Sequence, residues 1–459
     1  MFNHESDDRE ALKQLRKESL DLYNRLKSIE LDISFVNDMH KAYCDIPILP
    51  NLRCGAWYTD PDIRATGEVK GGYFKSTDGH YNAWRFSLRR PNLHLLPVAA
   101  ENGGKGLILV DSTRAGKRFP DALSKTVPIW CAVLNRALLI RRSAPGSSSW
   151  DTSLHTPPSI PTQEAAQITS RLDEWARELA CSSYSLPDLP RPLRPIWVTP
   201  AHSAFPHPPQ DCIPIICASA SAEGSIGRRA HGFSYIQGAG DDHELWGMGL
   251  TPELFWQHRT ALLGAERADL PSLVARLVSG HKPSPGIFHG PTPIQHAGSL
   301  LLLAAAADIN VFEEDVAYVV VGVDRAEQPL PRVLYLPITC NTRKSRSDSV
   351  LPSLLPRSTS FATHHLRLGR RVCFVCDDGR DVSVGLALVT LGLLFDDAGK
   401  LASDNTVTKA ALRTRLEWIV ASRPEANPSR ATLKRVNEFL MSGAYTVPML
   451  SQDSSVSDP

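Results

Sequence analysis

The sequence predicts an α/β protein of two domains, and three observations lead to this prediction. The chain has 459 residues, more than one compact core usually holds. In its C-terminal third, an apolar run at 372–376 precedes a short polar loop and an apolar stretch at 384–395. Strand, loop and helix in this order are typical of α/β folds. Nearer the N-terminus, apolar runs and helical periodicity are mixed, which indicates an α+β domain.

The first elements can be placed along the chain by periodicity. Residues 6–40 carry apolar side chains at steps of three and four, which predicts one long amphipathic helix. Residues 44–145 are expected to be rich in strands and turns. One of these strands, 107–110, ends at Asp111, where the chain leaves the expected sheet as a polar loop.

The next elements follow a loop rich in serine and proline. Residues 163–181 have helical periodicity. Eight prolines between 187 and 209 argue against regular structure in that stretch. Residues 213–219 (IPIICAS) then predict a buried strand.

A second proline-rich segment, at 281–293, predicts the boundary between the domains. After it, apolar runs predict strands at 318–323 and 333–338 in addition to the one at 372–376. The resulting division is an N-terminal helix at 1–45, a first domain at 46–290 and a second domain at 298–450.

Composition excludes several classes of protein. No run approaches the roughly 18 apolar residues that a membrane span requires, so no membrane association is expected. The polar, acidic N-terminus does not resemble a signal peptide. Nine cysteines without a disulfide spacing favour a reducing compartment, the cytoplasm or also the nucleus. Nothing in the composition predicts a stable protein partner.

The near-neutral total, 50 Lys and Arg against 49 Asp and Glu, conceals two basic segments. Residues 60–145 hold 14 basic and seven acidic residues, and residues 341–371 hold seven basic residues and one acid. Such segments fit a phosphate-bearing partner, although solvated surface charge is the alternative. The residues we expect to contact RNA are Lys75, Arg85, Arg89, Lys125, Arg343, Lys344, Arg346 and Arg430.

The loop at 376–383 lies between an apolar strand and an apolar helix, a position where backbone N–H groups converge on an anion. It looks like the phosphate loop of dual-specificity phosphatases, but Val382 stands where their arginine belongs. Thiol catalysis is therefore not expected, and the loop is predicted to bind phosphate or to be purely structural. The phosphate-binding candidates are Cys376, Asp377, Asp378, Gly379, Arg380, Asp381 and Ser383.

Two further polar segments are candidates for chemistry. Residues 111–118 follow a strand and combine hydroxyls with cations, as a phosphorylated donor requires, in Ser112, Thr113, Arg114, Lys117 and Arg118. Residues 241–244 (DDHE) stand beside flexible glycines and fit a general base or a Mg²⁺ site, with an exposed acidic loop as the alternative. The unranked catalytic candidates are Asp78, Asp111, Asp242 and His243, and the metal candidates are Asp241 and Asp242.

Several longer motifs together resemble the initiator-tRNA 2′-O-ribosyl phosphate transferases of fungi and plants. The resemblance extends over nearly the whole chain, apart from residues 187–209 and the C-terminal tail. The motifs are Cys54-Gly-Ala-Trp-Tyr58, Tyr73-Phe-Lys-Ser-Thr-Asp-Gly-His80, Val110-Asp-Ser-Thr-Arg114, Gly116-Lys-Arg118, Asp121 to Trp130, Ile236 to Glu244, Cys376 to Gly385 and Ala426 to Thr432.

The resemblance implies a pentosyltransferase that attaches a phosphoribosyl group to initiator methionine tRNA. The donor would be 5-phosphoribosyl 1-diphosphate, with Mg²⁺ as the metal, and the acceptor a ribose 2′-hydroxyl of adenosine 64 in the T-stem. The mark would exclude this tRNA from elongation. The resemblance also implies a family-specific N-terminal domain and a C-terminal domain with the dual-specificity-phosphatase fold. The alternatives are a phosphatase and a phosphatase-like protein that binds tRNA without catalysis.

Overall fold

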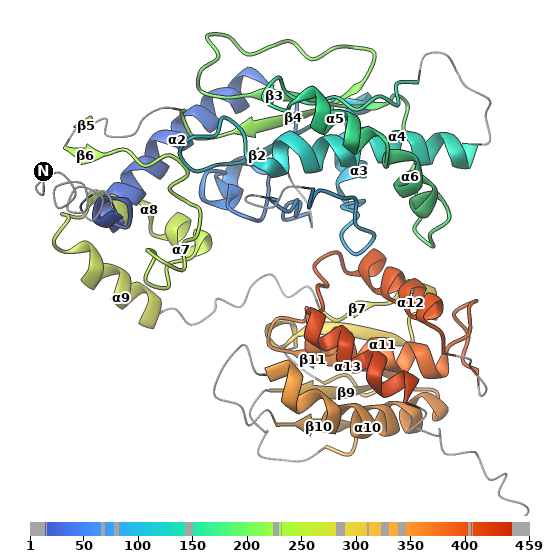
Figure 1. Ribbon diagram of the computed structural model, residues 1–459. Coiled ribbons are helices and arrows are strands. Elements are labelled where there is room, and N and C mark those ends of the chain that lie inside the picture. The colour runs from blue at the N-terminus through green and yellow to red at the C-terminus, as the bar shows by residue number, and fades with distance from the viewer. Residues whose placement is uncertain are drawn as a thin grey trace, which may run out of the picture. The chain divides into compact units, whose positions relative to one another are not determined.

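The computed structural model divides into two compact units (Figure 1). The first unit contains Met1–Cys181 and Ser185–Lys282, and the second contains Ser182–Tyr184 and Pro283–Pro459. The residues that the structure describes are 14, 16–65, 69–77, 82–142, 150–223, 229–230, 232–280, 290–309, 312–322, 330–337, 346–402, 405 and 407–442.

The first unit is organised around a four-stranded parallel sheet with the order β1-β2-β4-β3. The strands are β1 (Ile48–Pro50), β2 (Leu107–Asp111), β4 (Ile213–Ser219) and β3 (Leu193–Val198). Both central strands, β2 and β4, are buried along their whole length. Because all four strands are parallel, their carboxyl ends lie along one edge of the sheet.

Helices and short turns surround this sheet. Helix α4 packs against β3 and α6, and α3 contacts β4. Helix α2 forms one hydrophobic cluster with residues of α7 to α9. The helices are α2 (Leu22–Ala42), α3 (Leu95–Gly104), α4 (Val127–Arg142), α5 (Thr162–Thr169), α6 (Leu172–Ala180), α7 (Pro252–Gln257), α8 (Arg259–Gly264) and α9 (Leu270–Gly280), with a β5–β6 hairpin (Arg229–Ala230, Phe233–Ser234) and short helical turns at Gly55–Trp57, Pro61–Ile63 and Ala122–Thr126.

The single helix predicted at 6–40 is wrong in its extent. The chain is helical at 16–19, leaves the helix at Leu20 and Asp21, and starts again as α2 at Leu22. The Asp21 carboxylate accepts a hydrogen bond from the Asn24 backbone N–H at 2.9 Å, so this acid caps a new helix inside the apolar pattern. Residues 6–13 of the predicted helix lie outside the described residues.

The expectation that 44–145 is rich in strands is also wrong, since α3 and α4 occupy much of it. The helical stretch Ala122–Arg142 is long and apolar enough to cross a membrane by length and composition alone. Most of its residues are buried against neighbouring elements of the first unit, as in the core helix of a folded domain. Burial on most faces removes the amphipathic periodicity that would have predicted a helix.

The proline-rich stretch at 187–209 contains a strand, which corrects the prediction of irregular structure. β3 (Leu193–Val198) includes Pro195 and pairs with β4 on one side. It is one of the two edge strands of the sheet. Proline lacks the backbone N–H that a central strand needs on both sides, but an edge strand tolerates it.

The second unit contains a five-stranded sheet with the order β10-β9-β11-β8-β7. All its pairs are parallel except β7 with β8. Helices α10 and α11 lie against the sheet, and α12 and α13 pack on α11. Its elements are β7 (Thr292–Pro293), β8 (Leu301–Ala305), β9 (Val316–Val321), β10 (Val333–Leu336), α10 (Arg346–Arg367), β11 (Arg371–Cys376), α11 (Val382–Leu394), α12 (Lys409–Ser422) and α13 (Arg430–Met441), with turns at Gln295–Ala297 and Ala306–Asp308. The predicted α/β class is confirmed.

Candidate functional site

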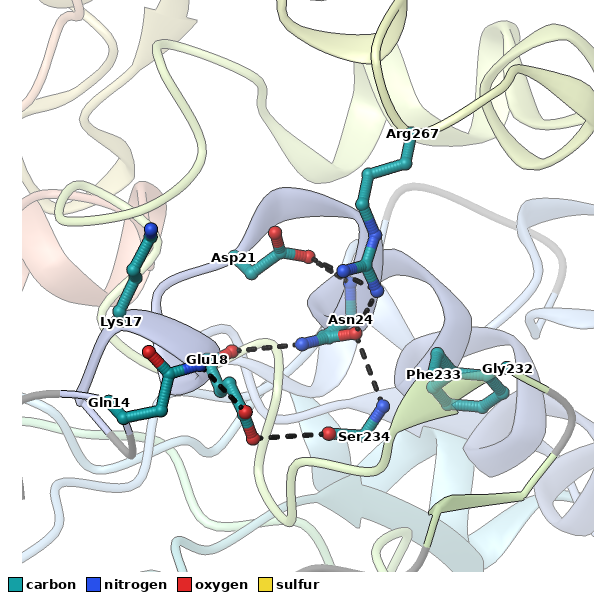
Figure 2. Close-up of a pocket in the computed structure, with 9 residues that line it drawn as sticks. All are labelled: Gln14, Lys17, Glu18, Asp21, Asn24, Gly232, Phe233, Ser234 and Arg267. Carbon is teal, nitrogen blue, oxygen red and sulfur yellow. Dashed lines mark hydrogen bonds and ion pairs between the residues drawn. The ribbon is translucent and has the colours of Figure 1, made fainter. Parts of the chain in front are cut away.

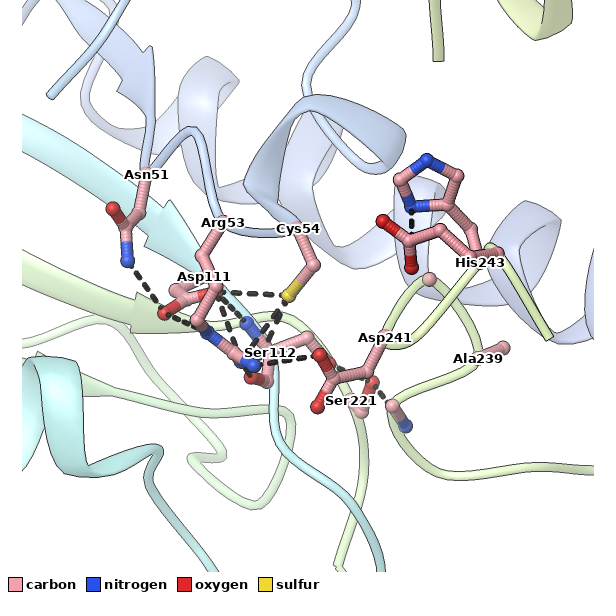
Figure 3. A network of polar contacts seen from close by, with 12 residues as sticks. Asn51, Arg53, Cys54, Asp111, Ser112, Ser221, Ala239, Asp241 and His243 are labelled. Atoms are coloured by element: carbon pink, nitrogen blue, oxygen red, sulfur yellow. Dashed lines mark hydrogen bonds and ion pairs between the residues drawn. The ribbon is translucent and has the colours of Figure 1, made fainter. Parts of the chain in front are cut away.

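A polar network lies where the strands of the first unit's sheet end (Figure 3). Asn51 follows β1, Asp111 ends β2, and Ser221 comes two residues after β4. A fourth segment, 237–243, lies beside them, and its Asp241 joins the same network. In open parallel sheets ligands bind outside the carboxyl ends of the strands, so this edge is the candidate site.

Asp111 is the centre of the network. Its side chain is fully buried and accepts hydrogen bonds from Asn51 Nδ2 at 2.8 Å and Cys54 Sγ at 2.9 Å. The backbone N–H of Ser112 donates a third, also at 2.9 Å. Burial, and next the Asp111 carboxylate, raise the pKa of Cys54 well above its ordinary value, so the thiol stays protonated and can donate.

Arg53 connects Asp111 with Asp241. Its guanidinium lies 3.3 Å from Asp111 Oδ1 and 2.6 Å from Asp241 Oδ1, and it also donates to the Ser112 carbonyl oxygen. Burial lowers the pKa of Arg53, but the Asp111 and Asp241 carboxylates beside it outweigh burial and raise that pKa. The result is a fixed cation between two acids, with its side chain 15% exposed at the edge of the sheet.

Gly55 allows the turn after β1 to approach β2 closely. A Cβ at this position would lie 2.0 Å from the Val110 carbonyl oxygen. We expect Gly55→Ala to lower the free energy of unfolding by about 3 kcal/mol, because the turn must move and weaken the contacts of Arg53 and Cys54. Urea denaturation measures the change. Gly264→Ala is the control, since a Cβ there meets nothing within 4 Å; equal effects of the two substitutions would contradict the explanation.

The 237–243 segment is held in place by an arginine of α2. Arg25 Nη1 donates to the Ala239 carbonyl oxygen at 2.9 Å. Of the predicted residues in this segment, Asp241 points to Arg53, and Asp242 is exposed with a φ of 48°. The ring of His243 packs against Trp57, with ring centroids 5.6 Å apart. The three neighbours thus have different surroundings, and Asp241 is the one that joins the network.

The predicted donor loop begins inside the site and then leaves it. Ser112 is buried, and its Oγ lies 2.6 Å from Ser221 Oγ. Thr113 is also buried, and its hydroxyl has no hydrogen-bond partner in the described part of the chain. Lys117 pairs with Asp121 at 3.1 Å. The remaining two cations of the loop, Arg114 and Arg118, are exposed.

The residues predicted to contact RNA have different surroundings. Lys75 and Arg85 are exposed and Arg89 is half-buried. Lys125 is largely buried and pairs with Glu164 at 2.9 Å, which indicates a structural role. Arg430 is the first residue of α13 in the second unit. Asp78, Arg343 and Lys344 lie outside the described residues, and for Arg346 the structure describes only its place at the start of α10.

Part of the basic excess at 60–145 is neutralised by acids from elsewhere in the first unit. These ion pairs lower the positive charge that the segment presents to a polyanion. They join Lys105 to Asp45, Arg136 to Asp173 and Arg142 to Asp188.

In the predicted phosphate loop of the second unit, the loop's own acids accept hydrogen bonds from backbone N–H groups. Asp378 Oδ1 accepts from the Arg380 backbone N–H at 2.9 Å, and Cys376 Sγ lies 3.5 Å from the same oxygen. Asp381 accepts from the Ser429 backbone N–H at 2.8 Å. Burial raises the pKa of Cys376, whose sulfur lies 3.0 Å from Ser383 Oγ.

The other predicted residues of this loop are either packed against β8 or exposed. Gly379 approaches β8 so closely that a Cβ would lie 2.7 Å from the Ala305 nitrogen, and its φ is 64°. Asp377 and Arg380 are exposed. Burial favours the protonated Cys376 thiol, and the Arg380 backbone N–H, which an anion in this loop would use, already donates to Asp378, so the loop lacks the reactive group of a phosphatase.

A separate hollow of about 470 Å³ lies at the N-terminal end of α2 (Figure 2). Its walls include Asn24, whose side-chain oxygen accepts from Arg267 Nη2 at 2.8 Å and from the Ser234 backbone N–H at 3.2 Å. Acids and bases alternate around it, and none of its lining residues belongs to the Asp111 network. We assign no ligand to it.

The predicted Mg²⁺ site fits the network only in part. In the part of the chain that the structure describes, no group of three or more His, Cys, Asp or Glu side chains is arranged to hold a metal. Asp111 and Asp241 both reach Arg53 and thus lie close to one another. Mg²⁺ is often held by one or two carboxylates together with substrate phosphates, but Arg53 already lies between these two acids and Asp111 is fully buried, so the pair does not present an open metal site.

Sequence reasoning missed four residues of the network next to Asp111, namely Asn51, Arg53, Cys54 and Ser221. Arg53 directly precedes the Cys54-Gly-Ala-Trp-Tyr58 motif, which identified the family resemblance but received no chemical role. A basic residue in a polar turn after a short apolar run was the available signal.

Comparisons with known proteins agree with the resemblance. Two family models match, the Rit1 N-terminal domain over residues 15–279 and the Rit1 DUSP-like domain over residues 334–440. An uncharacterized protein of Schizosaccharomyces pombe is 34% identical, covering 95% of this chain and 98% of that protein. The tRNA A64-2′-O-ribosylphosphate transferase of Saccharomyces cerevisiae is 32% identical, covering 94% of both chains.

Solved structures were also compared. Human DUSP28 matches with a TM-score of 0.24 and 15% identity, over 35% of this chain and 96% of that one. The first family model alone spans more than half of the chain and contains every residue of the Asp111 network, and both relatives align over nearly their full length. On these matches, the chain belongs to the Rit1 family.

Proposed function

We propose that this protein is a tRNA 2′-O-ribosyl phosphate transferase that modifies adenosine 64 of initiator methionine tRNA. The observation that carries the proposal is the 32% identity, over 94% of both chains, with the yeast enzyme of that name. The Asp111 network supports it, because it places a buried cation and two carboxylates at the ligand-binding edge of a parallel sheet.

The proposed reaction is a pentosyl transfer. The bond between the donor's anomeric carbon and its diphosphate breaks, a bond from that carbon to the tRNA 2′-oxygen forms, and the hydroxyl proton leaves to a base. Diphosphate departs with negative charge, which the cation of Arg53 and the exposed Arg114 and Arg118 are suited to stabilise. Among the described acids of the network, Asp241 is the more accessible candidate base, since its side chain is 20% exposed while Asp111 is fully buried.

A Mg²⁺ ion bound with the donor would neutralise further charge on the diphosphate. Arg53 lies between Asp111 and Asp241 and already occupies the position nearest to both carboxylates. Of the two predicted metal ligands, the exposed Asp242 is therefore the one that would be available to hold the ion.

The proposal is tested with the purified full chain, initiator tRNA and 5-phosphoribosyl 1-diphosphate labelled in the 5-phosphate. We expect acid-precipitable label on initiator tRNA and much less on elongator methionine tRNA. Nuclease digestion and mass spectrometry then locate the added group at adenosine 64. Folded protein that binds this tRNA but transfers no label would overturn the transferase in favour of a tRNA-binding protein.

Cys376 separates the transferase from a phosphatase. We expect Cys376→Ser to leave transfer within about twofold of the wild type, because the thiol is protonated and Val382 takes the place of the phosphatase arginine. Hydrolysis of p-nitrophenyl phosphate by wild type and variant is measured beside transfer. A wild-type hydrolysis that the substitution abolishes would establish thiol chemistry instead.

A further inference from the structure

A buried acid outside the ion pairs of the site lies on α2. Asp32 is 3% exposed, and its carboxyl accepts hydrogen bonds from Ser221 Oγ at 2.5 Å and Tyr235 Oη at 2.7 Å. Within the described residues, no lysine, arginine or histidine is its hydrogen-bond or ion-pair partner. Because an unpaired carboxylate is costly to bury, burial raises the pKa of Asp32 to about 8, although the two hydroxyls oppose the shift.

Asp32 begins a chain of hydrogen bonds that ends in the site. Ser221 Oγ lies 2.6 Å from Ser112 Oγ, and Figure 3 draws both side chains. Ser221 Oγ also contacts Asp32 and accepts from the Gly238 backbone N–H at 3.1 Å. Ser112 directly follows Asp111, and its carbonyl oxygen accepts from Arg53. One hydroxyl therefore ties α2 to the loop after β2 and to the 237–243 segment.

Tyr235 links Asp32 to the loop that follows β4. Its hydroxyl donates to Asp32 and accepts from the Ala222 backbone N–H at 3.0 Å. The other titratable group that bears on Asp32 is the phenol of Tyr58, which accepts from the Gly240 N–H at 2.7 Å. Burial, with Asp32 the next cause, raises the pKa values of both phenols, so neither ionises in the range where the protein is assayed.

The protonation state of Asp32 determines which groups donate and which accept along this series of hydrogen bonds. When Asp32 is ionised, Ser221 must donate its single hydroxyl proton to the carboxylate, and Ser112 must in turn donate to Ser221. When Asp32 is protonated, its own O–H can donate to Ser221, which then donates to Ser112, so that the Ser112 proton can go to the Tyr58 phenol oxygen, its other hydrogen-bond partner. The two states give the hydroxyl beside Asp111 opposite hydrogen-bonding roles.

We propose that Asp32 is a positioning residue of the site, which in its neutral form aligns the Ser112 hydroxyl through Ser221 and holds the loops after β2 and β4 with the 237–243 segment. The activity readout of this inference rests on the proposed transferase function. The substrate is the same phosphoribosyl donor, and because Ser112 is buried, Asp32 would act on the site through the position of these loops. Ionisation of Asp32 would reverse the chain and lower turnover.

The first test is the pH profile of Asp32→Asn, since the amide imitates the neutral acid. We expect kcat at pH 7 within about threefold of the wild type, and loss of the decline in kcat that the wild type shows as the pH passes about 8. Ser221→Ala breaks the chain and should lower kcat about tenfold with little change in KM. Asp38→Asn is the control on the same helix, because this side chain is 61% exposed.

The second test does not depend on catalysis. The folded protein keeps the Asp32 proton up to about pH 8, whereas the unfolded chain releases it near 4. The contribution of this group to stability is thus greatest below pH 4 and declines as the pH rises toward 8. Relative to wild type, Asp32→Asn should therefore gain several degrees in Tm between pH 5 and pH 8.

The outcomes separate the two proposals. If the wild type transfers no label, the transferase function fails, and the Tm comparison still decides whether Asp32 is held neutral. If Asp32→Asn and wild type share the same pH dependence of both Tm and kcat, the inference about Asp32 is overturned. A Tm difference without any change in the pH profile of kcat overturns the positioning role.

Discussion

Replacing Arg53 by alanine is expected to reduce transfer to initiator tRNA by at least about a hundredfold. Its guanidinium lies between Asp111 and Asp241 and also donates to the Ser112 carbonyl oxygen. Without it, two carboxylates are left facing one another where the diphosphate of the donor must bind, so their repulsion adds to the loss of a positive charge. Initial rates at saturating tRNA and donor measure the effect.

Two further variants make this result specific. Arg53→Lys keeps the charge but cannot reach all three partners, so an intermediate rate is expected. Arg136→Ala is the matched control, because Arg136 is 17% exposed, close to the 15% of Arg53, and pairs with Asp173 on α6. We expect Arg136→Ala to keep the wild-type rate. A folded Arg53→Ala protein with a rate within threefold of wild type would exclude Arg53 from catalysis.

Asp111→Asn is expected to lower the free energy of unfolding by about 3 kcal/mol and to abolish transfer. The carboxylate accepts from Asn51, Arg53 and Cys54, as well as from the following backbone N–H. An amide of the same size can accept with one atom only, so its nitrogen would face another donor, and the charge of Arg53 would lose one of its two partners. Urea denaturation gives the stability, and single-turnover transfer gives the activity.

The control for Asp111 is an acid with a comparable partner set outside the site. Asp151 has a side chain 19% exposed and pairs with Arg194 at 2.9 Å and with His155 at 2.6 Å. We expect Asp151→Asn to destabilise the protein without changing the rate of the folded fraction. If both variants lose transfer only in proportion to their loss of stability, Asp111 contributes to folding and not to the reaction.

Much of the fold could be predicted where a segment is buried on both sides or stands next to a clear turn. The apolar run 213–219 is a central strand, and 371–376 leads through a polar loop into α11 as expected. The errors arose where tertiary contacts override local pattern. Pro195 lies in a strand because that strand has one neighbour, and α4 has lost its periodicity because it is buried on most sides.

The candidate site was predictable at Asp111 and Asp241, but not at Arg53. Asp111 ends an obvious apolar strand, and Asp241 stands in an unusual acidic motif. Arg53 follows a strand of three residues, too short to recognise, and its importance depends on contacts with residues 111 and 241. Such contacts come from strand order, which no local window of the sequence contains. Asp32 is hidden for the same reason, inside the apolar pattern of a helix.

The strand order β1-β2-β4-β3 has a consequence for synthesis of the protein. β4 is made last of the four strands, yet it lies in the sheet between β2 and β3. While the ribosome is still translating the residues before it, β3 has no partner, and the loops that carry Ser221 and Asp241 do not exist. A nascent or prematurely terminated chain thus lacks the complete Asp111 network, so an incomplete product is not expected to modify tRNA.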